Sequence, residues 1–134
     1  MADILEKEVS YSATDVTLVT TAETLIITSP RVKIPTATAR VLVKAQAQLT
    51  NGTGTTAVTP RIRRGPLVTD PVVGDAIAEQ IKTAAGSTEP YELAVSELVQ
   101  DLDGVQYSFT LAQTAASANG TALQASIEVE VLNG

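Results

Sequence analysis

Strict alternation of apolar and polar side chains over residues 39–50 is the feature that most restricts the fold of this chain. One set consists of Val41, Val43, Ala45, Ala47 and Leu49, and the other of Leu42, Lys44, Gln46, Gln48 and Thr50. Because side chains of a β-strand alternate with a period of two residues, the two sets lie on opposite faces of the strand. A helix, by contrast, repeats every 3.6 residues. The segment therefore predicts a strand with one buried and one largely solvated face.

Similar extended runs occur along the rest of the chain, separated by clusters of Gly, Pro and Asn. They cover residues 15–21, 24–35, 58–64, 105–112 and 123–131. Thr and Val are among the commonest residues, and both favour strands. About eight short strands with turn signals between them predict an all-β fold, an antiparallel sandwich or barrel.

Two segments, 72–85 and 91–99, also fit a helix. In the first, Val73, Ile77 and Ile81 recur at helical spacing, and Gly86 could follow a helix end. Strand is the favoured interpretation of both segments, because strands are predicted on either side of them.

The last two alternating runs predict a β-hairpin. Tyr107, Phe109 and Leu111 alternate with polar residues before Asn119-Gly120, and an equally regular run follows it. Asn-Gly between two such runs is a strong short-range hairpin signal. The final strand is expected to be central in its sheet.

Composition argues against most enzyme classes. The 134 residues include no Cys, no His and no Trp, one Phe and three Tyr. The usual general base, nucleophilic thiolate and zinc ligands are therefore missing. We predict a protein that is not an enzyme, with no catalytic residues, no cofactor and no metal. Two other chemical motifs, Asp101-Leu102-Asp103-Gly104 and the pair Glu128 and Glu130, are interpreted as a turn and a solvated strand face.

Charge is segregated along the chain. Residues 31–64 carry seven basic and no acidic residues, whereas residues 83–134 carry seven acidic and no basic residues. These blocks can pair within the fold, or join one subunit to the next. The candidates for such a subunit interface are Arg61, Arg63, Arg64, Glu128 and Glu130.

Nucleic acid and membranes are not expected as partners. The net charge of −6 opposes approach to phosphate. No run approaches the 18 apolar residues of a membrane span, and the acidic start differs from a signal peptide.

Six motifs follow one another in the part of the chain from Val58 onward. They are Thr59-Pro60-Arg61-Ile62-Arg63-Arg64-Gly65, Val72-Val73-Gly74, Ala84-Ala85-Gly86-Ser87, Gln106-Tyr107-Ser108-Phe109-Thr110-Leu111, Ala118-Asn119-Gly120-Thr121 and Glu128-Val129-Glu130-Val131-Leu132. Their order resembles that of small jelly-roll structural proteins of tailed-phage virions. That group includes head decoration (cement) proteins and fibre-head domains, many of them trimers with a tumour-necrosis-factor-like topology.

The resemblance implies an eight-stranded antiparallel jelly roll and a structural role. The leading hypothesis is a homotrimeric decoration protein, made in the host cytoplasm, that binds the major capsid protein on the capsid surface and stabilises the phage head. The alternative is a tail-fibre or tail-tip head that binds a cell-surface receptor or glycan, through loops at 51–56 and 115–121.

The N-terminal segment has no clean period and is predicted to be a short arm. Residues 1–12 form this arm, and residues 13–134 form a single sandwich domain. With a capsid as partner, the arm would clamp a neighbouring subunit through edge pairing, apolar docking and charge. The residues predicted to bind are Ile4, Leu5, Glu6 and Glu8.

Overall fold

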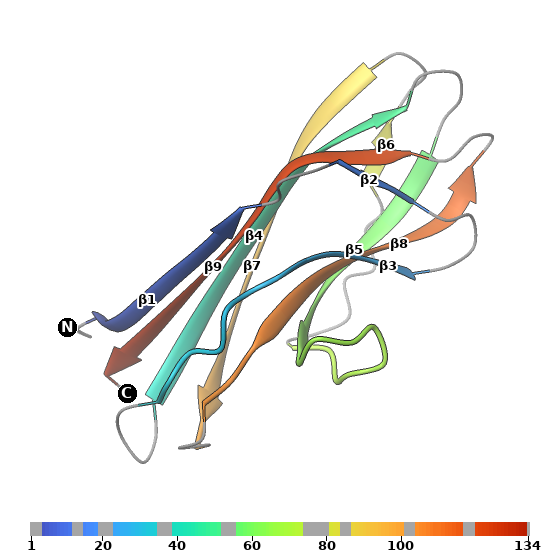
Figure 1. Cartoon of the computed structure of the whole chain (residues 1–134). Helices are drawn as coiled ribbons and strands as arrows, with labels where there is room; N and C mark the ends of the chain where they lie inside the picture. The colour runs from blue at the N-terminus through green and yellow to red at the C-terminus, as the bar shows by residue number, and fades with distance from the viewer. Residues whose placement is uncertain are drawn as a thin grey trace.

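The described part of the chain is all-β and forms two antiparallel sheets packed as a sandwich (Figure 1). The computed structural model describes residues 4–11, 15–18, 23–34, 39–51, 56–73, 81–83, 87–100, 104–116 and 120–133. Within them the chain has nine strands.

The first sheet contains the longest strands. Its order is β1–β9–β4–β7, and the short strand β2 pairs with the far end of β9. The bounds are Ile4–Tyr11 for β1, Val16–Thr17 for β2, Ala39–Asn51 for β4, Ser87–Val99 for β7 and Thr121–Asn133 for β9.

The second sheet has the order β3–β8–β5–β6. The bounds are Glu23–Thr28 for β3, Thr56–Arg64 for β5, Ile81–Thr83 for β6 and Tyr107–Ala116 for β8. Residues 71–73 also lie along β5, where Val73 N–H donates to the Ile62 carbonyl and Arg64 N–H to that of Pro71.

The core lies between the two sheets and is built from small aliphatic residues and two rings. The apolar set predicted for residues 39–50 is buried in full, with every member at most 5% exposed. Burying this face removes apolar surface from water, which is the main driving force for folding. The largest fully buried side chains include Tyr107, Phe109, Leu111, Ile62 and Ile127.

The hairpin predicted around Asn119-Gly120 is wrong. β8 pairs with β3 and β5 in the second sheet, whereas β9 pairs with β1, β2 and β4 in the first. The chain therefore crosses from one sheet to the other between them. Both sides of β8 and both sides of β9 are occupied by other strands, so neither has a free edge for the other. The prediction that the last strand is central is confirmed.

The described part of the predicted N-terminal arm is a strand. Glu8 lies opposite Val129, and Glu6 lies opposite Val131, so β1 extends the first sheet at its edge. Its mixed charges fit an edge position, which natural sheets often protect in this way. The four residues predicted for a capsid clamp belong to this strand, namely Ile4, Leu5, Glu6 and Glu8.

The described residues of the two ambiguous segments contain no helix, and most of them are strand. β7 covers 91–99 in full, and β6 covers 81–83. Val72 forms a single bridge with Arg63, and residues 74–80 lie outside the described residues. The run 15–21 is shorter than predicted, since β2 covers only Val16–Thr17 of its described part.

Candidate functional site

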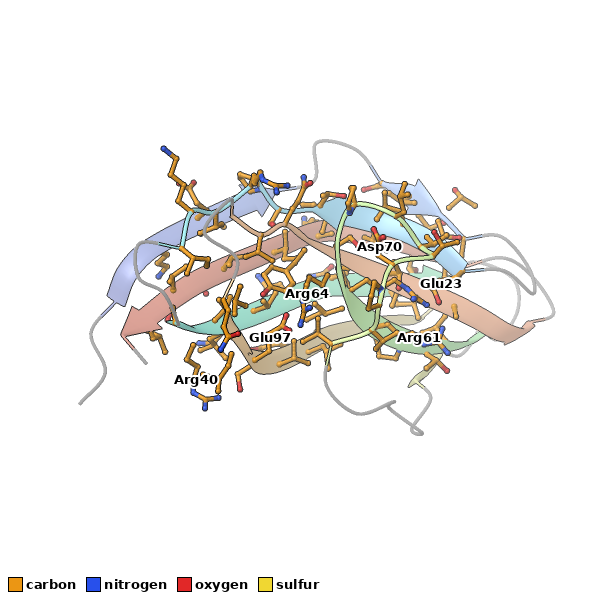
Figure 2. All side chains as sticks on the ribbon, turned by 90° about the horizontal axis from the view of Figure 1, so that it is seen from below. Glu23, Arg40, Arg61, Arg64, Asp70 and Glu97 are labelled. Carbon is orange, nitrogen blue, oxygen red and sulfur yellow. The ribbon has the colours of Figure 1, made fainter. Side chains whose placement is uncertain are left out.

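A cluster of Glu23, Arg61 and Arg63 connects the two strands that flank β8. Glu23 begins β3, and both arginines belong to β5. Figure 2 labels Glu23 and Arg61. Arg61 Nη1 lies 2.5 Å from Glu23 Oε1, and Arg63 Nη2 lies 2.9 Å from the same oxygen. Arg63 Nε contacts the second carboxylate oxygen at 2.5 Å, which makes this contact bidentate.

The cluster is partly shielded from solvent. The side chains of Glu23 and Arg63 are only 13% and 14% exposed. Partial burial acts to raise the pKa of Glu23, but the hydrogen bonds from Arg63 and Arg61 outweigh it, so the pKa lies below its ordinary value. Arg63 Nη1 also donates to the Asp70 carbonyl oxygen at 2.5 Å, which ties the 65–70 turn to the cluster.

Three further ion pairs account for the remaining predicted interface residues. Arg64 of β5 pairs with Glu97 of β7 and so links the two sheets. Lys7 Nζ lies 2.6 Å from Glu128 Oε1 and 3.6 Å from Glu130 Oε1. The hydrogen bond with Glu128 raises the pKa of Lys7, and Glu130 acts in the same direction.

All five residues predicted for a subunit interface thus have a charged partner within the chain. Of these pairs, only Arg64 with Glu97 joins the basic segment 31–64 to the acidic segment 83–134, and it does so between the two sheets. Glu23 and Lys7 belong to neither segment. Sequence reasoning missed the three partners, Glu23, Lys7 and Glu97, because no spacing along the chain connects them with positions 61–64 or 128–130. The subunit-interface role remains a prediction.

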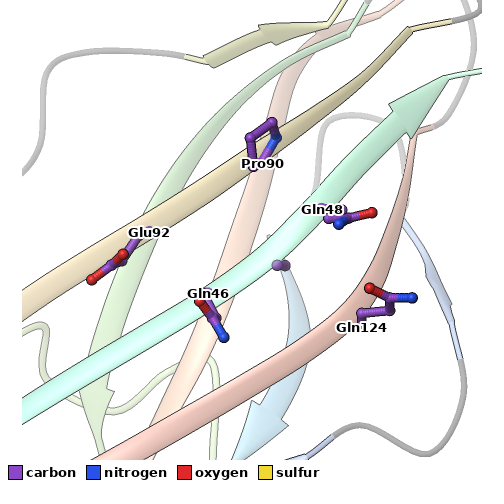
Figure 3. A pocket seen from close by; sticks show the side chains of 6 residues that line it. Gln46, Gln48, Pro90, Glu92 and Gln124 are labelled. Carbon is purple, nitrogen blue, oxygen red and sulfur yellow. The ribbon is translucent and has the colours of Figure 1, made fainter.

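A polar groove crosses the outer face of the first sheet (Figure 3). Its main part has a volume of about 300 Å³ and is lined by Gln46, Ala47, Gln48, Pro90, Glu92 and Gln124. A second part of about 180 Å³ shares Gln46 and Glu92 and adds Val9, Lys44, Ala45, Ser126 and Glu128. The groove therefore spans four strands of the sheet, and the sequence analysis did not identify it.

An irregularity in β9 shapes one wall of this groove. Gln46 lies opposite Ser126, but Gln48 lies opposite Leu123, so β9 carries one extra residue there. Gln124 occupies this bulge with a φ of 50°, in the left-handed region. Non-glycine residues seldom adopt this conformation, and bulges redirect side chains out of the regular alternation.

The Tyr107 hydroxyl is buried in the core. It has no hydrogen-bond partner among the described residues, and the residue is 0% exposed. Burial raises the pKa of Tyr107 far above its ordinary value, and the nearby positive charge of Arg64 opposes this only in part. The hydroxyl is inaccessible, so we assign it no chemical role.

The described residues contain no group of three or more His, Cys, Asp or Glu placed to hold a metal ion. The same residues include no helix long and apolar enough to cross a membrane. Most of the loops predicted for glycan binding, 52–55 and 117–119, lie outside the described residues.

Comparison with known proteins relates this chain to others by fold. No protein-family model and no curated protein matches it. A chain in the structure of infectious bursal disease virus, Gx strain, superposes with a TM-score of 0.59 at 8% sequence identity, over 95% of this chain. The two chains share a fold. This chain spans 32% of the length of that viral chain.

A second solved structure shows a more distant likeness. The CBM22-1 xylan-binding domain from Paenibacillus barcinonensis Xyn10C has a TM-score of 0.40 and 9% identity. The match covers 99% of this chain and 97% of that domain.

Proposed function

We propose that the chain is a jelly-roll protein of a virion, and that it acts as a homotrimeric decoration protein on the capsid surface. The observation that carries this proposal is the strand order. β1 and β2 pair with successive stretches of β9 and count as one interrupted strand. Counted in this way, the strands of the described residues number eight, four in each sheet, which supports a jelly roll of the kind used by viral capsid domains.

The comparisons support this proposal at the level of fold. The viral chain shares the fold over nearly the whole of this chain. The phage-virion resemblance of the segment from Val58 onward points to the same class of protein. A role in binding rather than chemistry also fits the site, because Glu23, Arg61 and Arg63 form structural ion pairs with one another.

The two edges of the first sheet are suitable for contacts with capsid or neighbouring subunits. Within the described residues, β1 pairs only with β9, and β7 pairs only with β4. Each edge therefore presents backbone N–H and C=O groups that another strand could pair with. The predicted capsid contact of Ile4, Leu5, Glu6 and Glu8 is retained in this form, as an edge strand rather than a free arm.

Mass spectrometry of purified particles tests the role directly. Particles from the source of this sequence are isolated on a density gradient, and this chain is quantified against the major capsid protein. A decoration protein is expected in amounts comparable to the capsid subunit. Absence from the particles would overturn the virion assignment.

Native mass spectrometry of the isolated protein tests the trimer. We expect a species of three times 13.9 kDa. A monomer at every concentration tested, in a protein that is abundant in particles, would restrict trimer formation to the capsid lattice and refute a stable free trimer.

A receptor-binding fibre or tail-tip head is the second candidate, and the polar groove on the first sheet favours it. Copy number separates the two candidates. A fibre head occurs in few copies per particle and localises to the tail, whereas a decoration protein covers the head. Immunogold labelling of the same particles would distinguish the two locations.

A further inference from the structure

We propose that the groove on the outer face of the first sheet binds a neutral glycan through the side-chain amides of Gln46, Gln48 and Gln124. This inference concerns a different surface from the edges used above. It does not depend on the virion role, and failure of either proposal leaves the other standing.

The first argument is the hydrogen-bonding capacity of the groove. Gln46 and Gln48 are successive outward residues of β4, and Gln124 reaches the same space from β9 (Figure 3). Each amide offers two N–H donors and a carbonyl acceptor. Within the described residues, none of these three side-chain amides has a hydrogen-bond partner. A ligand dense in groups that both donate and accept, such as the hydroxyls of a sugar, satisfies this set.

The second argument is the occupied backbone. β4 pairs with β9 on one side and with β7 on the other. A peptide therefore cannot add as a further strand beneath the groove, and recognition must come from side chains. An extended polypeptide, which binds sheets through main-chain hydrogen bonds, is therefore disfavoured. A ligand recognised by side chains alone is favoured.

The third argument is charge. The ionisable residues that line the two parts of the groove are Lys44, Glu92 and Glu128, with a formal sum of −1. Lys7, which is paired with Glu128 just outside this lining, brings the local sum to zero, so the groove has no excess of positive charge. Phosphate, sulfate or carboxylate groups on a ligand would meet two carboxylates and one ammonium group. The groove thus disfavours nucleic acid and anionic polysaccharides and accepts a neutral ligand.

The fourth argument is the bulge at Gln124. A regular strand would direct alternate side chains to opposite faces at fixed intervals. The extra residue and the left-handed φ of 50° instead bring Gln124 to the wall of the groove beside Gln48. Sparsely populated backbone conformations cluster at binding sites, where the surrounding structure holds them. The ring of Pro90, which is exposed beside the glutamines, supplies apolar contact for the C–H face of a sugar ring.

Affinity electrophoresis tests the proposal. The full chain is run in native gels that contain dextran, mannan or galactan, with heparin as the anionic comparison. We expect at least one neutral polysaccharide to retard the wild-type protein. We expect the double variant Gln46→Ala/Gln48→Ala to lose that retardation, and Gln124→Ala to reduce it several-fold.

Gln100→Ala is the matched control, because Gln100 is an exposed amide at the end of β7 outside the groove. It is expected to migrate like the wild type in every gel. Thermal melts followed by circular dichroism verify that each variant is folded. If a variant were unfolded, chemical-shift changes of the glutamine side-chain amides in ¹⁵N-labelled wild type, on titration with the retarding glycan, would give the same answer.

Three outcomes would overturn the proposal. The first is migration of the wild type unchanged by all three neutral polysaccharides. The second is retardation that persists in the double variant. The third is retardation by heparin alone, which would indicate charge-driven binding elsewhere. Loss of a native oligomer in the double variant, without any glycan retardation of the wild type, would assign the groove to a protein interface instead.

Discussion

Arg63 Nη2 lies 2.9 Å from Glu23 Oε1, although 40 residues separate the two positions in the chain. The contact spans β8, because β3 and β5 lie on either side of that strand. Arg61 contacts the same carboxylate from the next outward position of β5. One acidic residue therefore neutralises part of the basic segment and fastens three strands together.

Replacing Glu23 with Gln is expected to destabilise the fold by about 2 kcal/mol. The substitution keeps the shape of the side chain but removes the charge that accepts hydrogen bonds from two arginines. Hydrogen bonds to charged groups contribute about 1.5–3 kcal/mol each, and exposure at Arg61 lowers the total. Urea unfolding at pH 7 measures the change. Glu92→Gln, at an exposed position of β7, is the control and is expected to stay within about 0.5 kcal/mol of wild type.

The same carboxylate predicts an acid-dependent loss of stability. The pKa of Glu23 in the folded protein lies below the ordinary value of 4.5. As the pH falls below about 4.5, the unfolded chain binds a proton at this position before the folded protein does, so stability decreases. Glu23→Gln lacks this contribution. We expect the difference in free energy of unfolding between wild type and Glu23→Gln to be largest at pH 6 and to decrease toward pH 3. A difference that stays constant over this range would contradict the assignment.

Tyr107→Phe is expected to leave stability unchanged or to raise it by about 1 kcal/mol. The hydroxyl is buried without a described partner, and an unsatisfied buried polar group costs about 1–3 kcal/mol. The ring, which packs in the core, is retained. Thermal unfolding of the two proteins measures the effect. A loss of more than about 1 kcal/mol would show that the hydroxyl has a partner that the variant removes.

The difference in stability between wild type and Tyr107→Phe is expected to increase at alkaline pH. The pKa of Tyr107 in the folded protein is raised above the ordinary value of 10.0. Above pH 10 the unfolded chain releases this proton while the folded protein retains it, so the wild type loses stability as the pH rises. Tyr107→Phe lacks that loss. Urea unfolding at pH 8 and pH 10.5 is expected to show a growing advantage of the variant.

Gln124→Gly is expected to stabilise the fold by about 0.5–1 kcal/mol. A left-handed conformation costs a non-glycine residue about 1–2 kcal/mol, and the greater freedom of glycine in the unfolded chain offsets part of the gain. Gln46→Gly, in the regular part of β4, is the control and is expected to destabilise by about 1 kcal/mol. If both variants lost the same amount of stability, Gln124 would not be strained in solution.

Which residues face the core could be predicted from the sequence at several strands. In β4 the alternation assigned the buried residues from Val41 to Leu49 correctly, and in β9 Ile127, Val129 and Val131 are fully buried. β5 and β7 likewise occur where alternation indicated extended structure. These features follow from local geometry, since successive side chains of any strand point to opposite faces.

The N-terminal strand and the polar groove could not be predicted in this way. β1 shows no alternation because its mixed residues serve an edge, and its pairing with β9 joins segments at opposite ends of the chain. The groove combines residues of β1, β4, β7 and β9, and one wall depends on a bulge. No motif within a single segment contains that information.

The sequence by itself determined that the chain forms strands and which faces of several strands are buried. Only the tertiary structure decided which strands are neighbours. The Asn119-Gly120 signal favoured a hairpin, yet β8 and β9 lie in different sheets. The physical reason is that alternation sets the face that each strand buries, whereas pairing depends on competition among all strand edges. In that competition β3 and β5 occupy both sides of β8, and the last strand takes a central place in the other sheet.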